Sequence, residues 1–122
     1  MAGLTTTESQ ATLDARFPTS GATDHIAYST NGTTEFASLA RTPIGATGWA
    51  AATAADPSVK ANANALTSAA ATSAGTVSHF RIATAATAGT GRTDWTTLTT
   101  ARTVAIGDQL THAVGAIAVT LT

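Results

Sequence analysis

The chain has 122 residues and no cysteine, which excludes disulfide bridges, thiolate zinc ligands and a cysteine nucleophile. Its formal charge is −1, from six Lys and Arg against seven Asp and Glu, so it lacks the basic stripe of a nucleic-acid-binding protein. No stretch approaches the ~20 apolar residues of a membrane-spanning helix. Neither nucleic acid nor a membrane is therefore an expected partner.

Threonine and alanine dominate the composition, with 27 and 29 residues, whereas Leu, Ile, Val and Phe together make roughly one residue in six. Disorder is not expected, because it normally accompanies a high net charge. Threonine favours strands, since its branched Cβ suits a pleated surface. We therefore expect an ordered β-rich chain with a thin core, stabilised further by neighbours in an assembly.

The chain length fits one domain, composed of an N-terminal helix or arm over residues 1–22 and a β-domain over residues 23–122. Within the arm, the pattern predicts a short helix over residues 5–17 that ends before Pro18. Thr6 or Thr7 is expected to cap it, with Glu8 in its first turn. The residues expected to share its buried face are Leu4, Ala11, Leu13 and Phe17.

Residues 24–30 alternate as a half-buried strand does, with Ile26 and Tyr28 on one face. Asn31-Gly32 follows and predicts a two-residue hairpin turn. Residues 33–41 are expected to be extended, with a bend or bulge. Thr42-Pro43 is expected to end that segment, because proline is unusual in a paired central strand.

Residues 48–75 carry weaker signals, since Ala favours a helix while Thr, Ser and Asn oppose it. We predict strands over residues 49–53 and 62–67, separated by Asp56-Pro57, and a surface loop over residues 69–74. A helix in this region is the alternative.

The last third of the chain shows the clearest strand pattern. Strands are predicted over residues 76–84, around Trp95 and in residues 101–106, where Val104 and Ile106 are expected on one face. Gly107-Asp108 predicts a type II′ turn, Gly115 marks a further turn, and residues 116–122 alternate to the end of the chain. Together these segments predict an all-β fold, an antiparallel β-sandwich-like domain with a short N-terminal helix.

His79, Arg81 and Trp95 are the candidate contact residues. On a strand, His79 and Arg81 point away from the face that carries Phe80 and Ile82. One interpretation is that they bind a carboxylate or a phosphate. The other is that they face solvent or an interface, as polar residues of an ordinary strand do. The residues Gly89-Thr90-Gly91-Arg92 that follow lack the Lys-Ser/Thr of a phosphate-binding loop, so they are interpreted as a hairpin tip.

No metal or cofactor site is predicted. The residues able to ligate a metal are spaced without a pattern that makes them converge, and neighbours such as Asp24 and His25 face opposite ways on a strand. The set examined is Asp24, His25, His79, Asp94, Asp108 and His112.

The sequence does not predict an enzyme. No serine lies in a Gly-x-Ser-x-Gly elbow. Glu8 and Glu35 are the only glutamates, and a carboxylate pair for glycoside hydrolysis needs a cleft that so lean a core leaves little room for. The large aromatic residues Tyr28, Trp49 and Trp95 are expected to anchor the core or to sit centrally in an interface.

The order of the segments TEFASLAR, GTVSHFRI, WTTLTTARTVAIGDQL and GAIAVTLT resembles a group of small virion proteins of tailed phages, especially phages of actinobacteria. Members of that group are labelled tail-fibre-like, minor capsid or head-decoration proteins. The resemblance extends from about Asp24 onward and is strongest over residues 75–122.

The resemblance implies a non-enzymatic structural protein of the virion. The first role it suggests is decoration of the capsid surface, with the major capsid protein and copies of the chain itself as partners around a local symmetry axis. The alternative is a minor tail or tail-fibre-like protein that contacts the host surface. A carbohydrate-binding module or small hydrolase is a third class and needs a cleft with converging polar groups.

Overall fold

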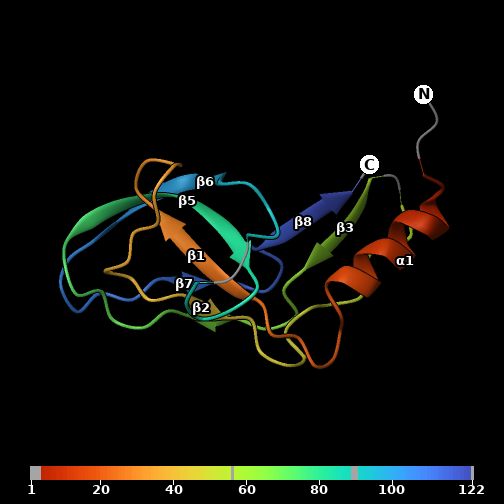
Figure 1. Ribbon diagram of the computed structural model, residues 1–122, viewed down its shortest axis with the longest axis horizontal. Coiled ribbons are helices and arrows are strands. Elements are labelled where there is room, and N and C mark those ends of the chain that lie inside the picture. Colours follow the sequence, from red (N-terminus) through yellow and green to blue (C-terminus); the bar gives the residue numbers. More distant parts are fainter. Residues whose placement is uncertain (1–3, 56, 89–90, 122) are drawn as a thin grey trace. The chain divides into compact units, whose positions relative to one another are not determined.

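A computed structural model describes residues 4–55, 57–88 and 91–121. Contacts divide the chain into two compact units, each built from segments that are distant in sequence. Unit 1 comprises Met1–Ala22, Ile44–Ala65 and His112–Thr122, and unit 2 comprises Thr23–Pro43 and Leu66–Thr111. The predicted fold class is confirmed, because antiparallel strands dominate and one short helix lies near the N-terminus (Figure 1).

In unit 1, helix α1 spans Thr6–Arg16, close to its predicted bounds. The N-cap is Thr5 rather than Thr6 or Thr7: its hydroxyl accepts a hydrogen bond from the backbone N–H of Glu8 at 3.2 Å. Leu13 and Phe17 are buried as predicted, and the Phe17 ring meets Trp49 edge-on with centroids 5.3 Å apart. The predicted helix face is partly wrong, since two of its members, Leu4 and Ala11, are exposed.

Polar side chains attach α1 to the rest of unit 1. Gln10 and Asp14, one helical turn apart, bond the C=O and the N–H of Ala52 at 3.1 and 2.9 Å. The same Asp14 oxygen accepts from Nζ of Lys60 at 2.6 Å, and the Lys60 side chain is fully buried. Lys60 belongs to β3 (Ser58–Ala61), beside which α1 lies (Figure 1).

Strand β3 pairs antiparallel with β8 (Ala118–Leu121), which lies within the alternating segment predicted over residues 116–122. Asn62, 1% exposed, directly follows β3 and fixes the segment that leads into β8. Its side-chain amide donates to the C=O of Asn64 and Ala113 at 2.7 and 3.0 Å, and its Oδ1 accepts from the N–H of Ile117 at 2.9 Å. Both N–H donors and the acceptor oxygen of this buried side chain are therefore used.

The predicted strands of the middle region are only partly correct. Residues 48–53 form no regular strand, yet they bond along residues 59–63, with an isolated bridge between Trp49 and Asn62. The described part of residues 48–75 holds no helix, and residues 69–74 are a loop. The predicted strand 62–67 is reduced to the bridge at Asn62 and β4 (Leu66–Thr67), which pairs with β7 (Thr111–His112).

Unit 2 is organised around a four-stranded antiparallel sheet in the order β2-β1-β5-β6 (Figure 1). Its members are β1 (His25–Ser29), β2 (Thr42–Pro43), β5 (Gly75–Ala83) and β6 (Thr96–Val104). The expected break at Thr42-Pro43 is instead a two-residue edge strand, a position that tolerates proline because its missing N–H faces outward.

One face of this sheet carries the apolar core. Ile26 and Tyr28 of β1 lie opposite Ile82 and Phe80 of β5, and all four are buried, as their alternation predicts. The Tyr28 hydroxyl bonds the side chain of Thr42 at 2.5 Å, and burial raises the pKa of Tyr28 to about 12. Tyr28 and Trp49 therefore anchor cores, as expected of large aromatics.

The turn after β1 is wider than the predicted two-residue hairpin. The chain reverses between Ser29 and Glu35, which form an isolated antiparallel bridge. Oδ1 of Asn31 accepts from the N–H groups of Thr33 and Thr34, both at 2.9 Å, while Gly32 has a φ of +78°. The Asn-Gly signal thus marks the reversal, but side-chain hydrogen bonds set its width.

Strand β6 is an edge strand with a bulge. Its two ends pair with β5, but the four residues 98–101 between them lie opposite the single residue Ser78. Only Val104 of β6 is buried, and Ile106, predicted on the same face, is 75% exposed in the following turn. In that turn Gly107 follows Ile106 with a φ of +91° and Asp108 N–H bonds Ala105 C=O, which is the type II rather than the predicted II′ arrangement.

We predict that Asn62→Asp lowers the free energy of unfolding by about 3–5 kcal/mol, because a buried carboxylate cannot donate and would face two carbonyl oxygens. Chemical denaturation at pH 7 measures this loss. Asn64→Asp is the matched control, since the Asn64 side chain is exposed. Equal stability of the two variants would show that the Asn62 amide does not hold unit 1 together.

The pKa of Asp14 lies below its ordinary value, first because of the Lys60 hydrogen bond and then because of the Ala52 N–H. Its carboxylate therefore adds stability above the unfolded pKa of about 3.9, which is lost as pH falls towards the folded pKa. We predict that Asp14→Asn costs about 1–2 kcal/mol at pH 7, a value reduced for the partial exposure of Asp14.

In denaturation across pH, the stability difference between Asp14→Asn and the wild type should narrow as the pH falls below the unfolded pKa of about 3.9 and close below the lowered folded pKa of Asp14, where both side chains are neutral. Asp94→Asn, at an exposed position, serves as the control for charge loss alone. A gap that is independent of pH would contradict a role for the ionised carboxylate.

Candidate functional site

Two of the three predicted contact residues lie in contact: Arg81 on β5 and Trp95 directly before β6. Phe80 pairs with Thr96, so the next position along β5 places Arg81 opposite Trp95. The guanidinium carbon of Arg81 lies 4.5 Å from the Trp95 ring centroid, a cation–π contact. Trp95 is therefore half-buried beside Arg81 rather than part of the apolar core.

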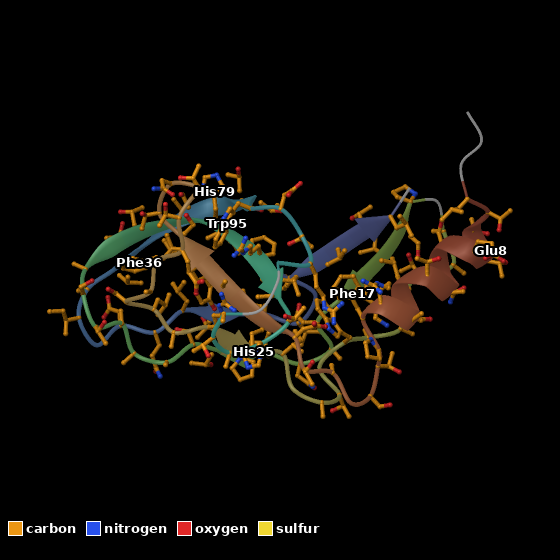
Figure 2. The ribbon with its side chains drawn as sticks, viewed as in Figure 1. Glu8, Phe17, His25, Phe36, His79 and Trp95 are labelled. Atoms are coloured by element: carbon orange, nitrogen blue, oxygen red, sulfur yellow. The ribbon has the colours of Figure 1, made fainter. Side chains whose placement is uncertain are left out.

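His79 shares the face of Arg81, two residues earlier on β5, and is also half-buried. Nδ1 of its ring is 2.7 Å from the Ser78 hydroxyl. A Cβ placed on Gly32 would lie 2.9 Å from Nε2, so the turn after β1 approaches the imidazole closely because it has glycine there. Figure 2 shows His79 and Trp95 near β5 and β6. We define the β5–β6 patch as His79, Arg81 and Trp95.

A second arginine next to this patch, Arg41, uses four of its five N–H donors on protein groups. Arg41 donates to both carboxylate oxygens of Glu35, at 2.9 and 2.7 Å, and to the C=O of Ala85 and Ala88, at 2.8 and 2.7 Å. Its side chain is only 7% exposed. The pKa of Glu35 is lowered chiefly by this hydrogen bond, against burial, with a further contribution from the charge of Arg81.

Arg41 also fixes the connection between β5 and β6. Ala88 has a φ of +53°, a conformation that is uncommon for a residue with a side chain, and its carbonyl is held by Arg41. The N–H of Arg92 bonds Ile82 C=O at 2.7 Å, and its Nε contacts Asp24 at 2.6 Å. The connection that leads to Trp95 is thereby fixed on both sides.

The patch holds a cation whose donors are not taken up in this way. Nε of Arg81 is buried and makes no hydrogen bond within the part of the chain that the structure describes. Glu35, the carboxylate whose pKa its charge influences, has both oxygens bonded to Arg41. Such an arrangement suits recognition of a negative group, because a guanidinium offers five donors in a rigid fork.

The residues considered for metal binding do not form a site. Among the described residues, no group of three or more His, Asp and Glu side chains is placed to hold an ion. Asp24 is paired with Arg92, the His25 ring bonds the C=O of Thr23 at 2.9 Å, and Asp108 accepts from the N–H of Ala105. These side chains of Asp24, His25 and Asp108 bond protein groups instead.

The proposed hairpin tip at Gly89-Thr90-Gly91 falls partly outside the described residues, because positions 89 and 90 are not among them. Gly91 is described and forms an isolated bridge with Ala83. A Cβ at Gly91 would lie 3.1 Å from Nη1 of Arg81, so this glycine lets the backbone pack against the guanidinium.

Sequence reasoning missed the polar residues that organise both units. No role was predicted for Arg41, whose hydrogen-bond partners include Glu35, six positions away, and Ala88, more than 40 positions away. Lys60 finds its partner 46 residues earlier. No local pattern could have found such long-range partners.

The described helix is too short and too polar to cross a membrane.

A comparison with family models matches residues 4–120 to Gp80, described as podophage GP4 fiber I protein gp80. The match spans nearly the whole chain and confirms the predicted relationship with phage virion proteins. Of the labels considered, it favours the tail-fibre-like one, while an actinobacterial host and head decoration stay predictions. No curated protein matches the chain.

We predict that Arg41→Lys lowers the free energy of unfolding by about 2–4 kcal/mol, because an ammonium cannot replace the bidentate contact and both carbonyl bonds together. Amide exchange of residues 84–88 should accelerate in the same variant. Arg102→Lys is the control, on the exposed strand β6. Unchanged exchange would show that Arg41 does not hold this segment.

Proposed function

We propose a structural role in the tail fibre for this chain, which belongs to the Gp80 family of phage fiber proteins. The chain is a phage structural protein, and the family match is the observation that carries the finer assignment. It supports the fibre over decoration of the capsid, the role first expected from the segment pattern.

The proposed mechanism is adhesion rather than catalysis. The described ion pairs each join residues within one unit: Arg41–Glu35 six positions apart, and Lys60–Asp14 and Arg92–Asp24 from distant segments. Charged groups used in this way are not free to act as acid, base or nucleophile. What the fold offers instead is exposed surface rich in threonine, above all on β6.

Copies of the chain are the first proposed partners. β6 is a sheet edge exposed on both faces, although its bulge over residues 98–101 discourages simple continuation of the sheet. Aliphatic side chains at two turns, Ile106 and Val114, are 75% and 64% exposed. If other copies of the chain covered these two side chains, the contact would bury apolar surface that adds to the small core of each copy.

Immunogold labelling of purified virions tests the fibre assignment. We expect antibodies against this chain to label the tail region, and gel densitometry to give few copies per particle. An antibody against the major capsid protein is the control for head labelling. Label spread over the head, with hundreds of copies per particle, would overturn the fibre role and restore capsid decoration with the major capsid protein as partner.

A further inference from the structure

The geometry points to an oxyanion-binding site in the β5–β6 patch, with the guanidinium of Arg81 as its main ligand-binding group. The ligand class is a carboxylate or a phosphate. Four observations in unit 2 support this assignment.

The first is an unmatched charge. Arg41 and Arg92 each contact a carboxylate, Glu35 and Asp24 respectively, at 2.6–2.9 Å. Among the described residues Arg81 makes no such contact, and the Glu35 oxygens both bond Arg41 instead. Two guanidinium groups therefore share one carboxylate, which leaves the surroundings of Arg81 positive.

The second is preorganisation. The Trp95 ring lies 4.5 Å from the guanidinium carbon of Arg81, and the backbone at Gly91 packs against the same side chain. The Trp95 contact favours the charged, planar group without using its N–H donors. Less side-chain entropy then remains to be lost when a ligand binds.

The third is an unsatisfied donor. A buried N–H without a partner destabilises the folded state, and native proteins hold few of them. Nε of Arg81 is such a group among the described residues. Nε itself is closed to solvent, so an oxyanion would bind the guanidinium through its Nη groups and balance the charge of a group whose Nε lacks a partner.

The fourth is a second polar group on the same face. His79 stands two residues from Arg81 on β5, and its Nδ1 is already engaged by the Ser78 hydroxyl at 2.7 Å. Nε2 lies on the other side of the ring, over Gly32. An imidazole N–H there can add one donor to those of Arg81.

The source of the oxyanion rests on the proposed function, because a fibre protein meets acidic polymers of a cell surface. Binding itself does not depend on that role. Immunogold label on the head would contradict the fibre role but not the anion site. Absence of anion binding would contradict the anion site but not the fibre role.

NMR titration of the isolated chain tests the site, with inorganic phosphate and glucuronate as probes and glucose as the neutral control. We expect a saturable shift of the Trp95 indole signal with at least one anion and none with glucose. A response to phosphate alone or to glucuronate alone supports the site and assigns its chemistry. No saturable shift with either anion would overturn it.

Arg81→Gln should weaken the binding by about ten-fold or more, since a charge-assisted bidentate contact is lost. Arg102→Gln makes the same change of charge on exposed β6 and should bind as the wild type does. An equal loss in both variants would reduce the effect to net charge and overturn the site. Arg81→Lys keeps the charge without the fork; if it melts as the wild type does, undiminished affinity would also contradict the proposal.

Discussion

In unit 2 the contact between Arg41 and Glu35 is the constraint on which the rest of the unit depends. It uses both oxygens of the only glutamate there and two backbone carbonyls of residues 85–88. The connection between β5 and β6 is thereby fixed, and Trp95 is placed against Arg81. Among the described residues Arg81 contacts no carboxylate, so its charge is not paired as that of Arg41 is.

Unit 1 is likewise held together by buried polar side chains that join different segments. The Asn62 amide joins residues 64, 113 and 117, and Lys60 joins α1 to β3 through Asp14. In a chain with so few bulky apolar residues, these buried polar contacts specify which distant segments meet. Their removal is costly because the remaining partner stays buried without a bond. The low content of Leu, Ile, Val and Phe thus explains why polar side chains organise the fold.

Local patterns were sufficient to predict part of the fold and little of the site. The alternation over residues 76–84 and the cap signals around residues 5–17 predicted β5 and α1, because period and capping depend on near neighbours. The predicted width of the turn after β1 was wrong because the Asn31 side chain bonds the backbone there. No local pattern predicted the bulge that interrupts the pairing of β6 with β5. The strand pattern placed His79 and Arg81 on one face, but the role of Arg41 needed three-dimensional contacts.

The family match fits a structural protein of the phage virion. Density for the chain in an electron cryo-microscopy map of the intact virion tests that account most directly. The account predicts both units within the tail fibre, with Arg81 and Trp95 facing solvent. Density on the capsid lattice, with that pair buried against the major capsid protein, would contradict it.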